Sequence, residues 1–168
     1  MSRKRCHRQR IVPLPPPGLR IKLSHDQVMD LQLAHVINLD AIAHGTAEDR
    51  MIWDYIGQVL TWYRAAELLK RDTSEMHTQL QVATRLVERF GRTGRVLFDG
   101  PDYQLAKRGL QIMDELARTV DELTATFACI WAKAQCERMA DMVKAERAQL
   151  LAAQAQPSAA THQQEHAL

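Results

Sequence analysis

One segment of the chain has the spacing of a zinc-peptidase motif. His162-Gln163-Gln164-Glu165-His166 fits the pattern H-x-x-E-H, in which two histidines one helical turn apart hold zinc and the glutamate acts as a general base. Such a site needs a further protein ligand and an enclosed pocket, whereas this match lies in a polar segment with two residues after it. We interpret the match as fortuitous and predict no metal site.

Histidine and cysteine elsewhere in the chain give little support for catalysis. His35 could work as an acid or base with Asp30 or Asp40, but a histidine on the inward face of a helix is usually a hydrogen-bonded core residue. Cys129 and Cys136 are seven residues apart on one expected helix, a rise of about 10.5 Å, which is too far for a disulfide. With no nucleophile elbow, phosphate-binding loop or dinucleotide fingerprint either, the sequence predicts a non-enzymatic protein without catalytic residues or cofactors.

The charge of the chain is concentrated at its N-terminus. Residues 1–25 hold seven Lys or Arg and no Asp or Glu, whereas the whole chain has a net charge of only +2. Guanidinium groups bind phosphates, so this arm is a candidate site for DNA or RNA; the alternative is a basic end that only aids solubility. A second basic cluster extends from residue 85 to residue 95. The predicted nucleic-acid-binding residues are Arg3, Lys4, Arg5, Arg8, Arg10, Arg92 and Arg95.

A proline block follows the arm. Pro13-Leu14-Pro15-Pro16-Pro17-Gly18 predicts an extended polyproline II segment, which is either a stiff spacer or a ligand for an aromatic-lined groove. The block also rules out the amphipathic helix of a mitochondrial presequence, and no apolar run resembles a secretory signal. The longest uncharged apolar stretch, residues 123–132, is about half of a membrane span, so we expect a cytoplasmic protein with no membrane partner.

Apolar periodicity predicts an all-α fold, a four-helix bundle with a long C-terminal helix. The expected helices cover residues 24–44, 47–71, 74–91 and 102 to about 153, within a domain of residues 24–156. Ser24-His25-Asp26-Gln27 fits a capping box at the first helix, and Gly45 ends that helix. Residues 1–23 and 157–168 are expected to be disordered.

The last expected helix is longer than its neighbours, which suggests an interface. Its apolar seam runs from Leu105 to Ala134, and beyond Gln135 the shorter helices are not expected to cover it. An uncovered apolar stripe on a helix is commonly an interface, for a second copy or another protein; the alternative is a fraying helix end. The predicted interface residues are Met139, Met142, Val143, Leu150 and Leu151.

The sequence of residues 13–69 resembles small accessory and regulator-like proteins of proteobacterial prophages and integrative elements. The resemblance rests on Pro-Pro-Gly-Leu-Arg, Leu-Ala-His-Val-Ile-Asn-Leu-Asp-Ala-Ile-Ala and Leu-Thr-Trp. It implies a mobile-element protein and assigns no site residue. We therefore expect a binding or regulatory protein that contacts nucleic acid through its arm; the alternative is a stoichiometric inhibitor or adaptor that binds a protein, such as a host defence or regulatory complex, through its helical surface.

Overall fold

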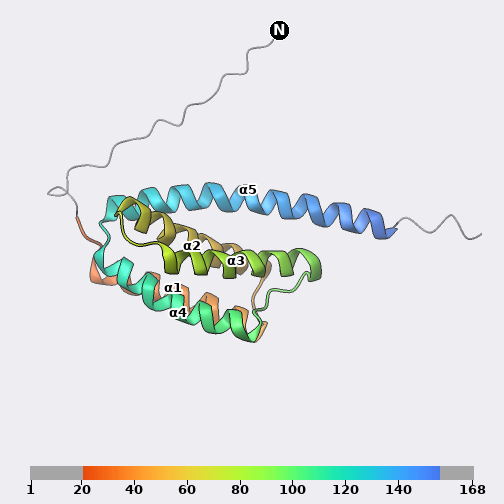
Figure 1. The fold of residues 1–168 in the computed structure, drawn as a ribbon, viewed down its shortest axis with the longest axis horizontal. Helices are drawn as coiled ribbons and strands as arrows, with labels where there is room; N and C mark the ends of the chain where they lie inside the picture. The colour runs from red at the N-terminus through yellow and green to blue at the C-terminus, as the bar shows by residue number, and fades with distance from the viewer. Residues whose placement is uncertain (1–20, 156–168) are drawn as a thin grey trace, which may run out of the picture.

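The chain folds into helices throughout the part that the structure describes. The computed structural model describes residues 21–155, which contain five helices and no strand (Figure 1). The predicted all-α, bundle-like fold is therefore confirmed, with five helices in place of four. The helices are α1 (His25–His44), α2 (Asp49–Leu68), α3 (Ser74–Thr93), α4 (Gly100–Thr119) and α5 (Glu122–Ala155).

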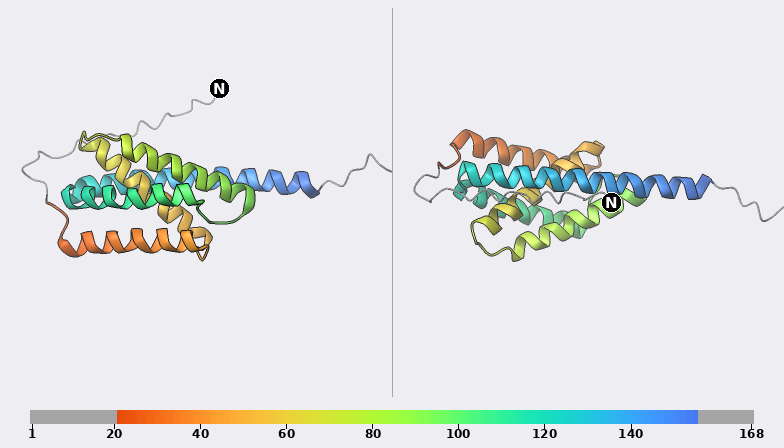
Figure 2. Two further views of the ribbon diagram at one scale, coloured as in Figure 1. Left: turned by 60° about the horizontal axis from the view of Figure 1, so that its bottom comes forward. Right: turned by 90° about the horizontal axis from the view of Figure 1, so that it is seen from above.

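The first four helices form an up-and-down bundle, and the fifth lies along one side of it. Among these four, helices that follow one another in the chain pack together, and α4 closes the bundle by packing on α1. Helix α5 packs mainly on α2 and less on α3, so it forms a separate layer above them (Figures 1 and 2). Helix α2 contacts all four other helices, as its broad apolar stripe predicts, and it contributes Tyr55, Ile56 and Trp62 to the core.

The ends of α1 are as the sequence predicts. The Ser24 hydroxyl accepts from the Gln27 backbone N–H at 3.2 Å, and the Gln27 side chain accepts from the Ser24 N–H at 2.7 Å. Gly45 ends the helix in the left-handed conformation, with a φ of 68°, which glycine adopts without the strain of a Cβ. Local side-chain chemistry is sufficient to place both boundaries.

The predicted single helix from residue 102 to about 153 is wrong. The chain leaves the helical conformation at Val120, with a ψ of 149°, and α5 starts afresh after it. Asp121 caps the new helix, because its carboxylate accepts from the Thr124 N–H at 2.8 Å and from the Thr124 hydroxyl at 2.7 Å. Val120 is fully buried beside this cap. The Asp121 cap and the buried Val120 therefore divide the expected single helix into two.

The break rotates α5 relative to that seam. Gly109, Leu116 and Val120 are buried as expected, but Ile130 is 62% exposed and Ala134 is also exposed. The inward positions of α5 are instead small residues such as Ala128 and Ala132. Small side chains let α5 lie close to α2, which explains why these two helices pack so extensively.

The start of α4 is also earlier than the expected boundary at residue 102, because α4 begins at Gly100. Asp99 is the cap and accepts from the Asp102 N–H at 2.8 Å, while Asp102 is buried in the first turn. There it accepts from Arg85 at 2.6 Å, and Arg89 lies 3.6 Å from its other oxygen. Arg89 also donates to Asp99 at 2.7 Å. These ion pairs hold the end of α3 against the start of α4.

The bundle covers α5 further along than expected. Val143 was expected to be exposed, but it is buried at 8% exposure, and Met139 is partly buried against the core. Further on, the Arg147 guanidinium lies over the Phe90 ring of α3 at 5.2 Å. Figure 1 shows α5 continuing past the end of α3. Only this last part of the helix projects.

Candidate functional site

A groove runs between α1 and α5 over the surface of α2. Helices α1 and α5 both pack on α2 but not on each other, and the space between them is a mostly apolar groove of about 940 Å³. One wall is formed by residues 31–38 of α1, the other by residues 125–137 of α5, and the base by residues 53–62 of α2. We call it the α1–α5 groove. It is large enough to hold a peptide segment or a small molecule.

A buried histidine–tryptophan pair lies at the centre of the α1–α5 groove. The Trp62 indole N–H donates to His35 Nε2 at 2.9 Å, and the two rings meet edge to face. Burial lowers the pKa of His35 to about 4. Since indole can only donate, the Nε2 lone pair is already used, and the proton of the neutral ring is on Nδ1. His35 is therefore the hydrogen-bonded core residue that its position on the helix suggests, and it cannot act as a base through Nε2.

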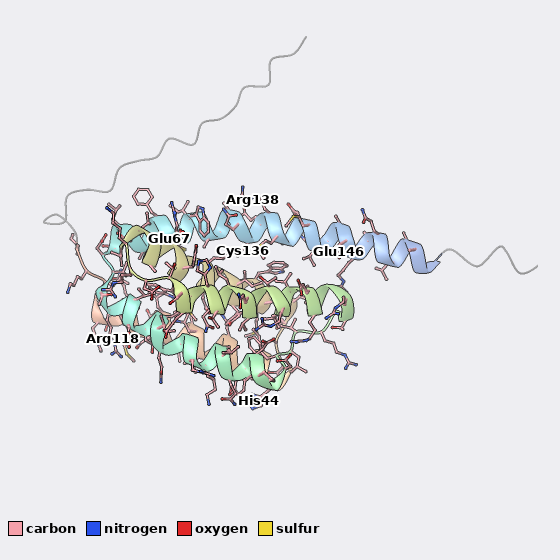
Figure 3. The ribbon with its side chains drawn as sticks, viewed as in Figure 1. His44, Glu67, Arg118, Cys136, Arg138 and Glu146 are labelled. Atoms are coloured by element: carbon pink, nitrogen blue, oxygen red, sulfur yellow. The ribbon has the colours of Figure 1, made fainter. Side chains whose placement is uncertain are left out.

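The far end of the groove combines a tryptophan with a thiol. Cys136 Sγ lies 3.8 Å from the Trp53 carbonyl oxygen and packs against Gly57. Figure 3 shows Cys136 on the side of α5 that faces α2. Burial, together with the carboxylates of Asp54 and Glu137, raises the pKa of the Cys136 thiol to about 11. The thiol stays protonated at neutral pH and behaves as an apolar lining atom.

The apolar surface of the groove continues over the outside of α1. Met29, Leu33, Val36 and Ile37 are each at least 50% exposed, and Ile37 also lines the groove. Their spacing places them on one face of the helix. The buried face of α1 is apolar as well, and a helix with apolar residues on both faces is usually covered on both. This outer face is therefore the surface of α1 that lacks a partner within residues 21–155.

The charged residues around the groove are mostly acidic. Asp54 and Glu137 line it together with one lysine, Lys133. Helix α1 contains three aspartates and no lysine or arginine. The three aspartates, Asp26, Asp30 and Asp40, are exposed. An acidic border favours a ligand that combines apolar side chains with positive charge.

The structure describes only two of the residues predicted to bind nucleic acid, Arg92 and Arg95. Arg3, Lys4, Arg5, Arg8 and Arg10 lie outside the described residues. Arg92 and Arg95 are exposed at the end of α3, whereas Arg85 and Arg89 of the same cluster are engaged by Asp99 and Asp102.

The arm joins the bundle at the opposite end from Arg92 and Arg95. The Ile21 carbonyl accepts from the Glu122 N–H at 2.8 Å, at the start of α5. The end of α3 contacts α5 near Arg147, 25 residues further on, or about 37 Å along the helix. The structure therefore separates the attachment point of the arm from the second arginine cluster.

Among the predicted interface residues, Met142 and Leu151 are exposed, at 65% and 63%. Met139 and Val143 contribute to the bundle instead, and the Leu150 side chain is not described. The H-x-x-E-H match, which we interpret as fortuitous, lies beyond the described residues as well.

The described part of the chain has neither a metal-binding cluster nor a membrane-spanning helix. Within residues 21–155, no group of three or more His, Cys, Asp or Glu side chains is placed to hold a metal ion. None of the five helices has the length and apolar character that a membrane span requires.

Comparison of this chain with protein families, with curated proteins and with solved structures gives no match.

The α1–α5 groove was not predicted from the sequence. Its walls come from two helices that are about 90 residues apart in the chain and that touch only through α2. The usable signal is in α1, where Leu33 and Ile37 broaden an apolar stripe that the bundle already fills with Val28, Leu39 and Ile42. More apolar surface than one side of a helix can bury indicates a second contact surface.

Proposed function

We propose that this protein is a non-enzymatic protein-binding module, an adaptor or stoichiometric inhibitor, and that it binds a segment of its partner in the α1–α5 groove. The observation that carries the proposal is the open, mostly apolar groove that continues onto the exposed face of α1. Large connected apolar surfaces on a protein usually mark an interaction site. The locked state of His35 and the protonated state of Cys136 support a role in binding over a role in catalysis.

The groove favours a particular kind of partner segment. Leu31, Ile37 and Trp53 present apolar surface, while Asp54 and Glu137 add negative charge at one end. A partner segment with bulky apolar side chains beside lysine or arginine satisfies both features. The acidic border contributes mainly to specificity and to the rate of association, and the apolar surface contributes mainly to affinity.

Site-specific photocross-linking tests this function in cells that produce the protein naturally. A benzophenone side chain at Leu33, which is 59% exposed on α1, is expected to give a discrete adduct with a partner protein. The same side chain at Gln111, an exposed position on α4, is the matched control and is expected to give none. Ile37→Asp is expected to remove the Leu33 adduct. Equal adducts at both positions, or an adduct that survives Ile37→Asp, would contradict the proposal.

A second candidate function is nucleic-acid binding through the arm, as the sequence predicts. Its support in the described residues is that Arg92 and Arg95 are exposed without an ion pair to a carboxylate. Seven phosphate contacts would give a log–log salt slope of about −6 on duplex DNA. Deletion of residues 1–12 should weaken binding and flatten that slope; an unchanged slope would contradict this function. A regulatory role in a mobile element is compatible with either candidate.

A further inference from the structure

The α1–α5 groove has the aromatic side chain of Trp53 at its far end, and the described chain begins near its other end. Trp53 is partly buried there, and its indole N–H makes no hydrogen bond within residues 21–155. At the near end, Ile21 is held by its hydrogen bond to Glu122, and Lys22 forms a β-bridge with Asp121. The described chain therefore begins at Ile21, beside Glu122, three residues before the Ala125 end of the groove.

The chain before Ile21 has the chemistry that the groove favours. Residues 8–20 read Arg-Gln-Arg-Ile-Val-Pro-Leu-Pro-Pro-Pro-Gly-Leu-Arg, with three arginines and no acidic residue. The prolines favour polyproline II, which has three residues per turn and leaves backbone carbonyls free to accept hydrogen bonds. Pro13 and Pro16 share one edge of such a helix, and aromatic-lined grooves bind that edge with an indole N–H donating to a carbonyl.

The length of this segment matches the length of the groove. Glu137 lies 15 residues after Glu122 on α5, a distance of about 22 Å along the helix. A polyproline II segment advances about 3.1 Å per residue, so about seven residues cover that distance. Gly18 supplies the flexible position at which the chain can turn toward the groove, and counting seven residues back from Gly18 leads to Ile11. Arg10 then lies near Asp54 and Glu137, where its charge is complementary.

We propose that residues 10–19 bind in the α1–α5 groove of their own chain, with Pro13 and Pro16 against Trp53 and Arg10 near Glu137. The segment occupies the same surface as a partner segment of similar chemistry, and a partner must displace it. This inference rests on the proposed function for the identity of the competing ligand, but the contact itself is independent of any partner.

Tryptophan indole N–H resonances of the full-length protein, recorded by NMR, test the contact. Leu14→Asp/Pro16→Asp is expected to shift the Trp53 signal and leave Trp131, which does not line the groove, unchanged. Ser158→Asp/Ala160→Asp makes the same change of charge in the C-terminal segment and should shift neither signal. A Trp53 signal that is the same in the wild type and in the Leu14 variant overturns the proposal.

Two further measurements distinguish this contact from exchange of the segment between two copies and from the proposed function. Light scattering tests for exchange between copies: a wild-type dimer that the Leu14→Asp/Pro16→Asp change converts to a monomer would place the segment in a second copy and overturn the intramolecular contact. The photocross-link at Leu33 tests the proposed function separately. If the Trp53 signal shifts but no partner adduct forms, only the proposed function is contradicted. If an adduct forms, its yield is not raised by Leu14→Asp/Pro16→Asp, and the Trp53 signal does not shift, only this inference is contradicted.

Discussion

His35 illustrates how a single buried side chain makes stability depend on pH. The unfolded chain takes up a proton on this histidine near its ordinary pKa of 6.5, and the folded protein does so only near about 4. Between these values the unfolded state binds more protons, so the free energy of unfolding falls as the pH falls. We expect a loss of about 2 kcal/mol from His35 between about pH 7 and about pH 5.

Urea unfolding at several pH values measures this loss. His35→Gln keeps an acceptor for the Trp62 N–H but has no titratable group, so its stability should depend less on pH over the same range. Equal pH dependence in the two proteins would show that His35 is not the source.

A second prediction concerns the packing of Gly109 on α4. A Cβ at this position would collide with the amide end of Gln79, a buried residue whose Nε2 donates to the Leu105 carbonyl at 3.0 Å. Gly109→Ala should gain about 1 kcal/mol in helix propensity but lose more through overpacking, for a net destabilisation of about 1 to 2 kcal/mol. In a Gln79→Ala background the same change should be stabilising, since the obstruction is gone. Thermal unfolding of the four proteins measures both effects, and the same sign in both backgrounds would contradict the prediction.

A third prediction at this scale concerns how much the buried carboxylate of Asp102 contributes to stability. It is 2% exposed and pairs with Arg85 and Arg89, which are themselves partly exposed. Asp102→Ala should cost about 2 to 3 kcal/mol, at or below the usual cost of breaking a buried pair because water screens the arginines. Asp141→Ala breaks an exposed pair with Lys144 at 3.9 Å and should change stability by less than about 0.5 kcal/mol. Similar losses in the two variants would mean that Asp102 is no more important than a surface charge.

At the scale of helices, the division between α4 and α5 depends on the Asp121 cap. Asp121→Ala removes the acceptor of both Thr124 hydrogen bonds and should destabilise the protein by about 1 to 2 kcal/mol. Asp121→Asn retains a capping oxygen and should cost less. Chemical denaturation with circular dichroism detection compares the two variants; equal losses would mean that the charge of Asp121, and not the cap, is what stabilises this turn.

The same junction shows how much of the fold the sequence could predict. Where a boundary depends on local chemistry, as at Ser24 and Gly45, the sequence predicts it to within a residue. The break at Val120 had its own local signal, an aspartate followed by Glu122 in the first turn, but a nearly regular apolar seam hid it. Apolar spacing can continue across a break when each helix uses a different phase of the pattern. Apolar periodicity therefore identified the helical regions but not the division of the last region into two helices.

The α1–α5 groove could be predicted less well, because it depends on how helices are arranged. The burial of His35 was predictable from its place in the stripe of α1. Its partner Trp62 was not, since the pairing depends on how α1 and α2 cross. Nor does the sequence show that α1 and α5 stay apart on α2. A site between elements far apart in the chain needs the three-dimensional arrangement.

For the whole molecule, the remaining prediction is association through the end of α5. The exposed apolar residues of this end are now Met142 and Leu151, because Val143 is buried. Full-length protein is expected to be a dimer by light scattering, and Met142→Asp/Leu151→Asp is expected to be a monomer, since the charges would face apolar surface. A wild type that remains monomeric at micromolar concentrations would remove the homodimer and leave only a different partner for this end.

The order of the helices has a consequence for synthesis. Of the five described helices, α1 leaves the ribosome first, yet α4, which packs on it, is complete only about 75 residues after α1 ends. At about 5 to 20 residues per second, this delay is about 4 to 15 s. During that time α1 has apolar residues open on several faces, including Met29 and Leu33, which stay open in the folded protein. We therefore expect chaperones that bind growing chains to meet α1 before any other helix.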